Sequence, residues 1–243
     1  MGSAGAGSRT LVVCGAGRTA DVVATAMASL GHDVMRVPGP RDADVARAEL
    51  VFACGPDEAG IAELVGRVRP GCTVVNTCAP PWESTAELAA AIGRAEAGVV
   101  SNPVGSQREA GLEDFLAPDV IVIGADDPAE AGAVADVYAA IPAPIVHTDV
   151  RTADLTGPAR NGLCAVKRQF FAELVLLCRA VGADVESVLE CLRTDRRIGA
   201  PLTGAGGDHL GSGERGSDDR LRELAGPDTP PTLRALGCPR RSG

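Results

Sequence analysis

A short glycine-rich segment constrains the fold of this chain more than any other feature: Gly15-Ala16-Gly17-Arg18-Thr19-Ala20. It follows the apolar run Leu11–Cys14, which is typical of a buried strand, and a helical pattern begins at its end. In this setting Gly15 allows a tight turn, Gly17 lets an anion approach the backbone, and Ala20 permits close packing of helix against strand. The segment therefore predicts a strand–turn–helix unit of the kind that binds the pyrophosphate of a dinucleotide.

Further short apolar runs in the first 150 residues are predicted to be strands, and helical patterns separate several of them. The runs are Val34–Val37, Leu50–Ala53, Thr73–Thr77, Val99–Ser101, Val120–Gly124 and Pro144–His147. The helical patterns cover Thr19–Leu30, Glu58–Val68, Ser84–Ile92 and Pro128–Ala139. Because buried strands alternating with helices build sheets covered on both faces, we expect a Rossmann-type α/β domain with a doubly wound, mostly parallel sheet.

The acidic residue that usually accompanies such a loop is missing. It is expected at the end of the second strand, where it would hold the ribose hydroxyls of NAD. Here that strand is followed by Pro38, and Asp33 lies at its other end. Arg36 and Arg41 are interpreted as surface side chains, with contact to the 2′-phosphate of NADP as the alternative. NAD or NADP is therefore a candidate cofactor that lacks this usual partner, and the residues assigned to it are Gly15, Gly17, Arg18, Thr19 and Ala20.

Residues 152–181 carry one long helical pattern. Pro158 is expected near its first turn, where a missing N–H costs little, and Gly182 is expected to end it. Asp184 is expected to cap a second, short helix over Val185–Leu192. A long helix that leaves a nucleotide-type domain is often the spine of a dimer, so we expect a homodimer through residues 152–181.

These patterns divide the chain into four parts. Residues 1–8 are a Gly/Ala/Ser tail that we expect to be disordered, 9–150 form the Rossmann-type domain, and 151–198 form the helical dimerisation segment. Residues 199–243 are rich in Gly, Pro, Ser and Asp, so we expect a loop and a disordered tail there.

The composition argues against several classes of function. A formal net charge of -9 with dispersed basic residues opposes nucleic-acid binding. No apolar run reaches the ~18 residues of a membrane helix and the start is no signal peptide, so we expect a soluble, cytoplasmic protein. The 8 cysteines form no C-x-x-C pair, so we expect no metal site and interpret the thiols as small buried side chains. A composition rich in Ala, Gly, Val and Arg, with Lys167 as the single lysine, is typical of bacteria.

Several motifs follow one another in the order found in the UDP-glucose/GDP-mannose dehydrogenases, and the chain resembles that family over roughly residues 10–222. In the first domain they are Gly31-His32-Asp33-Val34, the Thr77–Thr85 stretch around Pro80-Pro81, Ser101-Asn102-Pro103, the segment Glu113–Asp119 and Val122-Ile123-Gly124. In the helical part they are Thr152-Ala153-Asp154, Asn161, Lys167, Phe170, Glu173, Gly182-Ala183-Asp184-Val185, Asp195 and Arg197-Ile198-Gly199.

The resemblance implies a four-electron oxidation that this chain is not equipped to perform. Such enzymes oxidise a sugar-nucleotide alcohol to the acid with two NAD, through a thioester on the cysteine of G-G-S-C-F-P-K-D. Glu214 takes the place of that cysteine, or Gly213 when the serines are matched, and neither can form a thioester. Gly157 takes the place of the oxyanion lysine in K-x-x-x-N, where Asn161 is kept. Val104 takes the place of the water-orienting glutamate.

Two larger parts of the family pattern are also missing. The region between the second and third strands is shorter, and the C-terminal Rossmann domain that binds the nucleotide of the sugar does not follow. We therefore expect a diverged, truncated member of the family, repurposed for a non-thioester step of acid/base or cyclisation type on a small molecule in a bacterial biosynthetic pathway. The alternatives are an NAD(P)-dependent oxidoreductase that makes a single hydride transfer, and a non-catalytic dimeric scaffold.

The candidate catalytic residues are Asn161, Lys167, His209 and Glu214. By the resemblance, these side chains can lie in the cleft that holds the active site in the UDP-glucose/GDP-mannose dehydrogenases. Histidine titrates near neutrality, which suits acid/base work, although a solvated loop is the alternative for His209 and Glu214. Cys164 is interpreted as core packing, with a substitute nucleophile as the alternative. His32 is interpreted as structural and His147 as a strand end.

Overall fold

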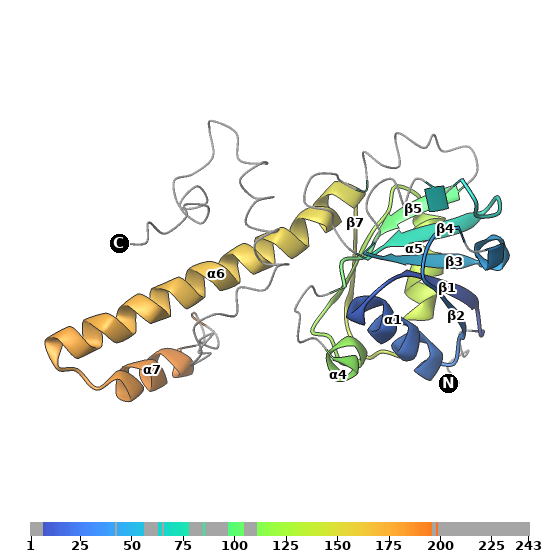
Figure 1. Ribbon diagram of the computed structural model, residues 1–243. Helices are drawn as coiled ribbons and strands as arrows, with labels where there is room; N and C mark the ends of the chain where they lie inside the picture. Colours follow the sequence, from blue (N-terminus) through green and yellow to red (C-terminus); the bar gives the residue numbers. More distant parts are fainter. Residues whose placement is uncertain are drawn as a thin grey trace, which may run out of the picture. The chain divides into compact units, whose positions relative to one another are not determined.

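The computed structural model describes residues 7–41, 43–55, 63–64, 66–77, 85, 97–104, 111–195 and 198. The chain divides into two compact units, residues 1–157 and 158–243, and the boundary lies inside one long helix. The described strands of the first unit form one seven-stranded sheet (Figure 1). The predicted α/β fold is therefore confirmed, while the four-part domain division stays a prediction.

The sheet has the strand order β2-β1-β3-β4-β5-β6-β7. Its strands are β1 (Thr10–Gly15), β2 (Asp33–Val37), β3 (Leu50–Cys54), β4 (Cys72–Asn76), β5 (Ala97–Ser101), β6 (Ile121–Gly124) and β7 (Ile145–Thr148). Strands β1 to β5 are parallel, whereas β6 pairs antiparallel with β5 through Ser101 and Gly124. The sheet is thus mostly parallel, as predicted, and each strand ends within about two residues of its predicted bounds.

The two faces of the sheet carry separate apolar clusters. Along β1, Leu11 and Val13 belong to the cluster that includes helices α1 (Arg18–Ser29) and α5 (Pro128–Val137), whereas Val12 and Cys14 belong to the other cluster. All four side chains are buried. This two-residue alternation with burial on both sides explains why the strands are continuous apolar runs.

Two short elements were not predicted from the sequence. The 3-10 helix η1 spans Ala43–Arg47 and helix α4 spans Leu112–Leu116. Elements of five residues are too short to show a helical period, and α4 depends on tertiary packing of the buried Phe115. Of the helix predicted at 58–68, residues 63–64 and 66–68 are described and residues 63–64 are helical, whereas of the helix predicted at 84–92 only Thr85 is described.

The second unit contains most of α6 (Val150–Val181) and all of α7 (Val185–Thr194), which confirms the two predicted helices. The expectation for Pro158 was wrong, because it lies two turns inside α6. The helix begins at Val150, two turns before Pro158. Its start is stabilised there because the Asp149 carboxylate accepts a hydrogen bond from the Thr152 N–H at 2.9 Å. At Pro158 the ring removes one backbone hydrogen bond that α6 would otherwise make.

The turn between α6 and α7 has the predicted chemistry. Gly182 adopts a φ of 72°, which ends α6, and Asp184 caps α7 by accepting from the Ser187 N–H at 2.9 Å. Hydrogen bonding from the side chain and the backbone of Ser187 lowers the pKa of the Asp184 carboxyl below its usual value. The Thr152 hydroxyl and N–H do the same for the pKa of Asp149 at the start of α6.

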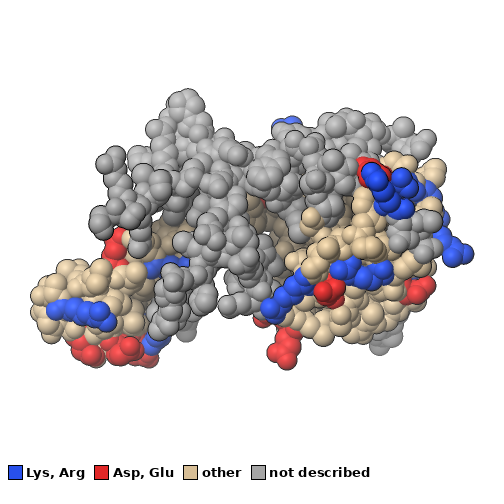
Figure 2. All heavy atoms as spheres, in the orientation of Figure 1, with Lys and Arg blue, Asp and Glu red and all other residues tan. Residues whose placement is uncertain are grey.

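Within the described part of the chain, none of the helices has the length and apolar character that crossing a bilayer requires. On the face that Figure 2 shows, basic and acidic side chains are interspersed.

Candidate dinucleotide site

The glycine segment joins β1 to α1 at the point where the sheet changes its direction of growth. Strand β2 lies on one side of β1 and β3 on the other, and all three run parallel. In doubly wound sheets ligands bind at the carboxyl ends of the strands beside such a switch point. The loop that begins at Gly15 therefore occupies the position where a ligand is expected.

Gly15 is required by the neighbouring strand. It has a φ of 138°, and a Cβ atom there would lie 1.8 Å from the carbonyl oxygen of Cys54, its partner in the β1–β3 register. Gly55, which follows β3, has a φ of 83°. The loop thus packs directly on the end of β3, where only a residue without a side chain fits.

Gly17 lies on the side of the loop that is not covered by protein atoms. It has a φ of 86° and a ψ of -176°, and no atom lies within 4 Å of the position a Cβ would take. It is the N-cap of α1 and offers no side-chain cap, so the first N–H groups of α1 can bind an anion. Arg18 and Thr19 are exposed beside it, whereas Ala20 is fully buried against the sheet. The residues of this loop therefore fit a pyrophosphate.

Arg36 holds the glycine loop in place through hydrogen bonds. The sequence analysis interprets it as a surface side chain or as a ligand of the 2′-phosphate of NADP, and neither interpretation includes this contact. From β2 its guanidinium donates to the backbone carbonyl of Gly15 and, at 3.1 Å, to that of Val37. It also donates to the Asp21 carboxylate of α1, at 2.9 Å from Nη2 and 3.2 Å from Nε. Arg36 thus ties the glycine turn, β2 and the first turn of α1 together. This contact depends on the β1–β2 register, which places residue 36 beside residue 13. No short sequence motif predicts it.

A buried polar cluster lies past the end of β4. The Asp154 carboxylate in α6 accepts from the Thr85 N–H at 2.6 Å and from its hydroxyl at 2.7 Å. The Asn76 amide donates to the same hydroxyl at 3.0 Å. The cluster holds the start of α6 to the carboxyl edge of the sheet. The motifs place Asp154 and Thr85 in separate parts of the sequence, and the structure joins them through two hydrogen bonds.

Asn102, in the Ser-Asn-Pro motif, joins three elements rather than facing a ligand. Its amide donates to the Val122 carbonyl at 2.7 Å, and its oxygen accepts from the Tyr138 hydroxyl at 2.6 Å. Burial raises the pKa of Tyr138 well above its usual range, so the hydroxyl remains a donor. The next but one residue, Val104, packs against the same core cluster. An apolar side chain thus occupies the position that the resemblance assigns to a glutamate.

The candidate catalytic residues are only partly described. Asn161 is buried in α6, and the Lys167 ammonium donates to the Ile198 carbonyl at 3.3 Å. Six helical positions separate Asn161 from Lys167, which places them about 120° apart around the helix axis. The assignment of Asn161 and Lys167 to one site stays a prediction, and His209 and Glu214 lie outside the described residues.

The thiols and imidazoles that can be compared behave mainly as predicted. Cys14, Cys54, Cys72 and Cys178 are buried, and burial raises the pKa of Cys72 to about 11, against the opposing effect of Arg69. Cys164 is half-buried and Cys191 is exposed, so burial was the wrong expectation for Cys191. The structural role of His32 is confirmed, since its ring bonds the Arg9 N–H at 3.4 Å and the Val137 carbonyl at 3.0 Å. Among the described residues, no group of three or more His, Cys, Asp or Glu side chains could hold a metal ion.

Comparison with known proteins supports the resemblance seen in the motifs. Residues 151–213, which include α7 and nearly all of α6, match the model of the UDP-glucose/GDP-mannose dehydrogenase family, central domain. The UDP-glucose 6-dehydrogenase of Rhizobium meliloti is 38% identical over 123 residues, covering 49% of this chain and 28% of that protein. The chain is a relative of the UDP-glucose/GDP-mannose dehydrogenases.

Two further relatives extend the family likeness across both units. The UDP-glucose 6-dehydrogenase of Pseudomonas aeruginosa is 30% identical over 196 residues, covering 72% of this chain and 43% of that protein. The UDP-glucose dehydrogenase structure from Pyrobaculum islandicum aligns with 98% of this chain and 69% of its own, at a TM-score of 0.79 and 26% identity. The chain therefore spans less than half the length of the curated relatives it matches.

Proposed function

We propose that this relative of the sugar-nucleotide dehydrogenases binds a dinucleotide and carries out a step that needs no thioester, of acid/base or cyclisation type, on a small molecule in a bacterial biosynthetic pathway. The open glycine loop supports the first part of the proposal most directly. Its residues Gly15, Gly17, Arg18, Thr19 and Ala20 would hold the pyrophosphate of NAD or NADP at the start of α1. When bound, such a cofactor accepts or donates a hydride.

The second part of the proposal rests on replaced side chains. Oxidation of an alcohol to an acid requires a thiolate to trap the aldehyde, and the resemblance places Glu214 or Gly213 there. Val104 packs against the core where the water-orienting carboxylate would lie. At Gly157 a Cβ would meet no atom within 4 Å, so space alone does not exclude the lysine that is missing. The losses concern separate parts of one mechanism, which supports a change of chemistry rather than a single exchange.

The groups proposed for the altered chemistry are Asn161, Lys167, His209 and Glu214. Neutral imidazole and a carboxylate can take and return protons near pH 7, which assigns His209 and Glu214 to acid/base roles. Asn161 would orient a substrate oxygen or amide. Lys167 would supply positive charge, provided that it leaves the Ile198 carbonyl.

A single hydride transfer is the second candidate function, and the intact glycine loop favours it. The glycine-loop assignment and the loss of four-electron oxidation are tested by titrating the purified chain with NADH and NADPH, following nicotinamide fluorescence, and by incubating it with NAD and UDP-glucose or GDP-mannose. We expect saturable dinucleotide binding that Gly17→Ala abolishes, and no uronate. Uronate formation coupled to NAD reduction would refute the loss of four-electron oxidation. Failure of both reduced dinucleotides to bind at millimolar concentration would refute the loop assignment and favour a scaffold.

A homodimer through residues 152–181 belongs to the same proposal. Leu163, Phe170 and Leu177 lie seven residues apart on one stripe of α6, and their side chains are 57–63% exposed. Val181, one turn beyond Leu177, is also exposed. An apolar stripe of this kind on a long helix is typical of helix–helix association. The same stripe favours the scaffold as a third candidate.

The dimer is tested by light scattering coupled to gel filtration. Phe170→Glu is expected to give a monomer, because it introduces a charge into the stripe. Ala172→Glu introduces the same residue about 200° around the helix at an exposed position and is expected to leave the dimer intact. A wild-type chain that elutes as a monomer at micromolar concentration would contradict this assembly.

A further inference from the structure

The middle of helix α6 holds the residue types that weaken a helix most. Gly157, Pro158 and Gly162 lie within six positions of the chain, and α6 contains no other glycine or proline. Glycine loses more backbone freedom in a helix than any other residue, and proline lacks the N–H that a helix interior uses. The weak positions of this 32-residue helix are therefore gathered in one short segment, residues 156–162.

Two successive carbonyls just before this segment have altered hydrogen bonding. Pro158 has no N–H to donate to the Asp154 carbonyl, four residues back, and its ring crowds that carbonyl. The Thr156 hydroxyl donates to the Ala153 carbonyl at 2.7 Å, and this carbonyl is the acceptor that the Gly157 N–H has in a regular α-helix. Hydroxyls that bond back to the preceding turn are associated with bent helices. The backbone of α6 is thus loosened at the same place where its glycine and proline residues lie.

The turns of α6 before this segment are fixed to the first unit. Ala153 is fully buried, and a Cβ on Gly124 at the end of β6 would lie 2.4 Å from the Ala153 Cβ. The Asp154 carboxylate accepts both hydrogen bonds of the buried Thr85. Because these contacts join the first turns of α6 to the edge of the sheet, they oppose any bending before residue 156.

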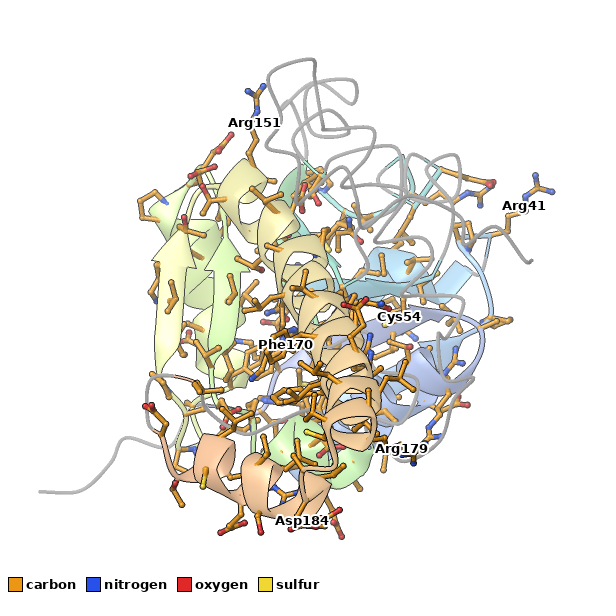
Figure 3. All side chains as sticks on the ribbon, turned by 90° about the vertical axis from the view of Figure 1, so that its left-hand side faces the viewer. Arg41, Cys54, Arg151, Phe170, Arg179 and Asp184 are labelled. Atoms are coloured by element: carbon orange, nitrogen blue, oxygen red, sulfur yellow. The ribbon has the colours of Figure 1, made fainter. Side chains whose placement is uncertain are left out.

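The turns after this segment form the other arm of α6. Residues 163–181 contain no glycine or proline, and Figure 3 labels Phe170 and Arg179 along them and Asp184 at the start of α7. The boundary between the two compact units falls inside residues 156–162. The loosened segment therefore separates an arm that belongs to the first unit from an arm that belongs to the second.

We propose that residues 156–162 are a hinge, at which α6 bends so that the second unit changes its direction relative to the first. Hinges are short runs of residues that absorb a change of backbone angles, and glycine absorbs such a change most readily. The resemblance assigns a lysine to position 157, so Gly157 exchanges a charged group for backbone freedom. The hinge goes beyond the proposed function, because it requires neither a bound dinucleotide nor a dimer.

The test measures the distance between the two units by double electron–electron resonance in the full-length chain. Spin labels are attached to a ketone-bearing unnatural amino acid at Thr25 in α1 and Glu186 in α7, two exposed positions, so that no native cysteine is labelled. Dilution with unlabelled chain removes signals between chains. We expect a broad distance distribution in the wild type, which narrows to a single orientation in the double variant Gly157→Ala with Pro158→Ala. This variant restores the missing N–H and the helix propensity of both positions.

Gly132→Ala is the matched control. Gly132 lies inside α5, and a Cβ there meets no atom within 4 Å, as at Gly157. The control adds the same methyl group to a helix of the first unit and should leave the distance distribution unchanged. Gly157→Ala alone is the milder variant, in case loss of the buried Pro158 ring prevents folding. It should slow amide hydrogen exchange over residues 157–163 about fivefold, because alanine favours a helix over glycine by about that factor.

Three results would overturn the hinge. The first is a wild-type distance distribution as narrow as that of the folded double variant, and the second is equal amide exchange over residues 157–163 in wild type and Gly157→Ala. The third is an equal narrowing caused by Gly132→Ala, which would show an effect of overall stability. Loss of dinucleotide binding or of the dimer refutes the proposed function alone, since both readouts of the hinge are measured within single chains.

Discussion

Replacing Gly15 with alanine tests the structural basis of the glycine loop. The new Cβ would lie 1.8 Å from the Cys54 carbonyl oxygen and 2.7 Å from its carbon, and both are backbone atoms of a neighbouring strand. Since real Cβ contacts stay beyond 3.0 Å, β1 and β3 must separate by more than an ångström at this point. The φ of 138° adds strain for any residue with a side chain.

The expected cost is about 3–5 kcal/mol. Backbone strain at a positive φ accounts for roughly 1–3 kcal/mol, and the forced separation of two buried strands accounts for the rest. Because a domain of this size is stable by about 5–15 kcal/mol, the variant should lose a large part of its free energy of unfolding. Urea unfolding followed by far-UV circular dichroism measures this loss.

Gly17→Ala is the control for that experiment. Its Cβ meets no protein atom within 4 Å, so only the strain of a φ of 86° remains, about 1–2 kcal/mol. The variant should fold and fail to bind a dinucleotide, because its Cβ projects toward the pyrophosphate. A Gly15→Ala protein within 1 kcal/mol of wild type would refute the close approach of the loop to β3, and a Gly17→Ala protein that binds normally would refute the position of the ligand.

Three further predictions concern hydrogen-bonded groups. Asp154→Ala removes the carboxylate that accepts two hydrogen bonds from Thr85, so we expect about 3 kcal/mol less stability in urea unfolding; a change below 1 kcal/mol would contradict the buried cluster. Tyr138→Phe leaves the buried Asn102 oxygen without its donor and should cost about 1–3 kcal/mol, measured by the same method, whereas no loss would mean that Asn102 finds another partner. The lowered pKa of Asp184 stabilises α7 fully above its unfolded pKa near 4, and this stabilisation is lost as the pH falls below about 4 through the folded pKa. Helix content between pH 5 and 2 should therefore fall less steeply in Asp184→Asn than in wild type; identical profiles would show that the cap has no part in it.

The catalytic candidates illustrate how far sequence reasoning reaches. The resemblance assigns Asn161 and Lys167 to a cleft, and the helix period separates the two positions by about 120° around the axis of α6. The Lys167 ammonium donates a hydrogen bond to the carbonyl of Ile198, 31 residues further along the chain. Sequence spacing does not predict a contact over that separation. Arg36 is a similar case, because its contact with Gly15 joins residues 21 positions apart through the pairing of β1 with β2.

The sequence by itself determined the strands, the main helices and the glycine loop, since each depends on neighbours along the chain: apolar runs buried on both faces, a 3.6-residue period, or a turn that only glycine can make. Only the tertiary structure decided which side chains meet at the sheet edge, namely Arg36 with the loop, Asp154 with Thr85, and Arg41 with Glu63. These contacts depend on strand order and register, and residues far apart in the chain become neighbours only when the whole sheet has formed.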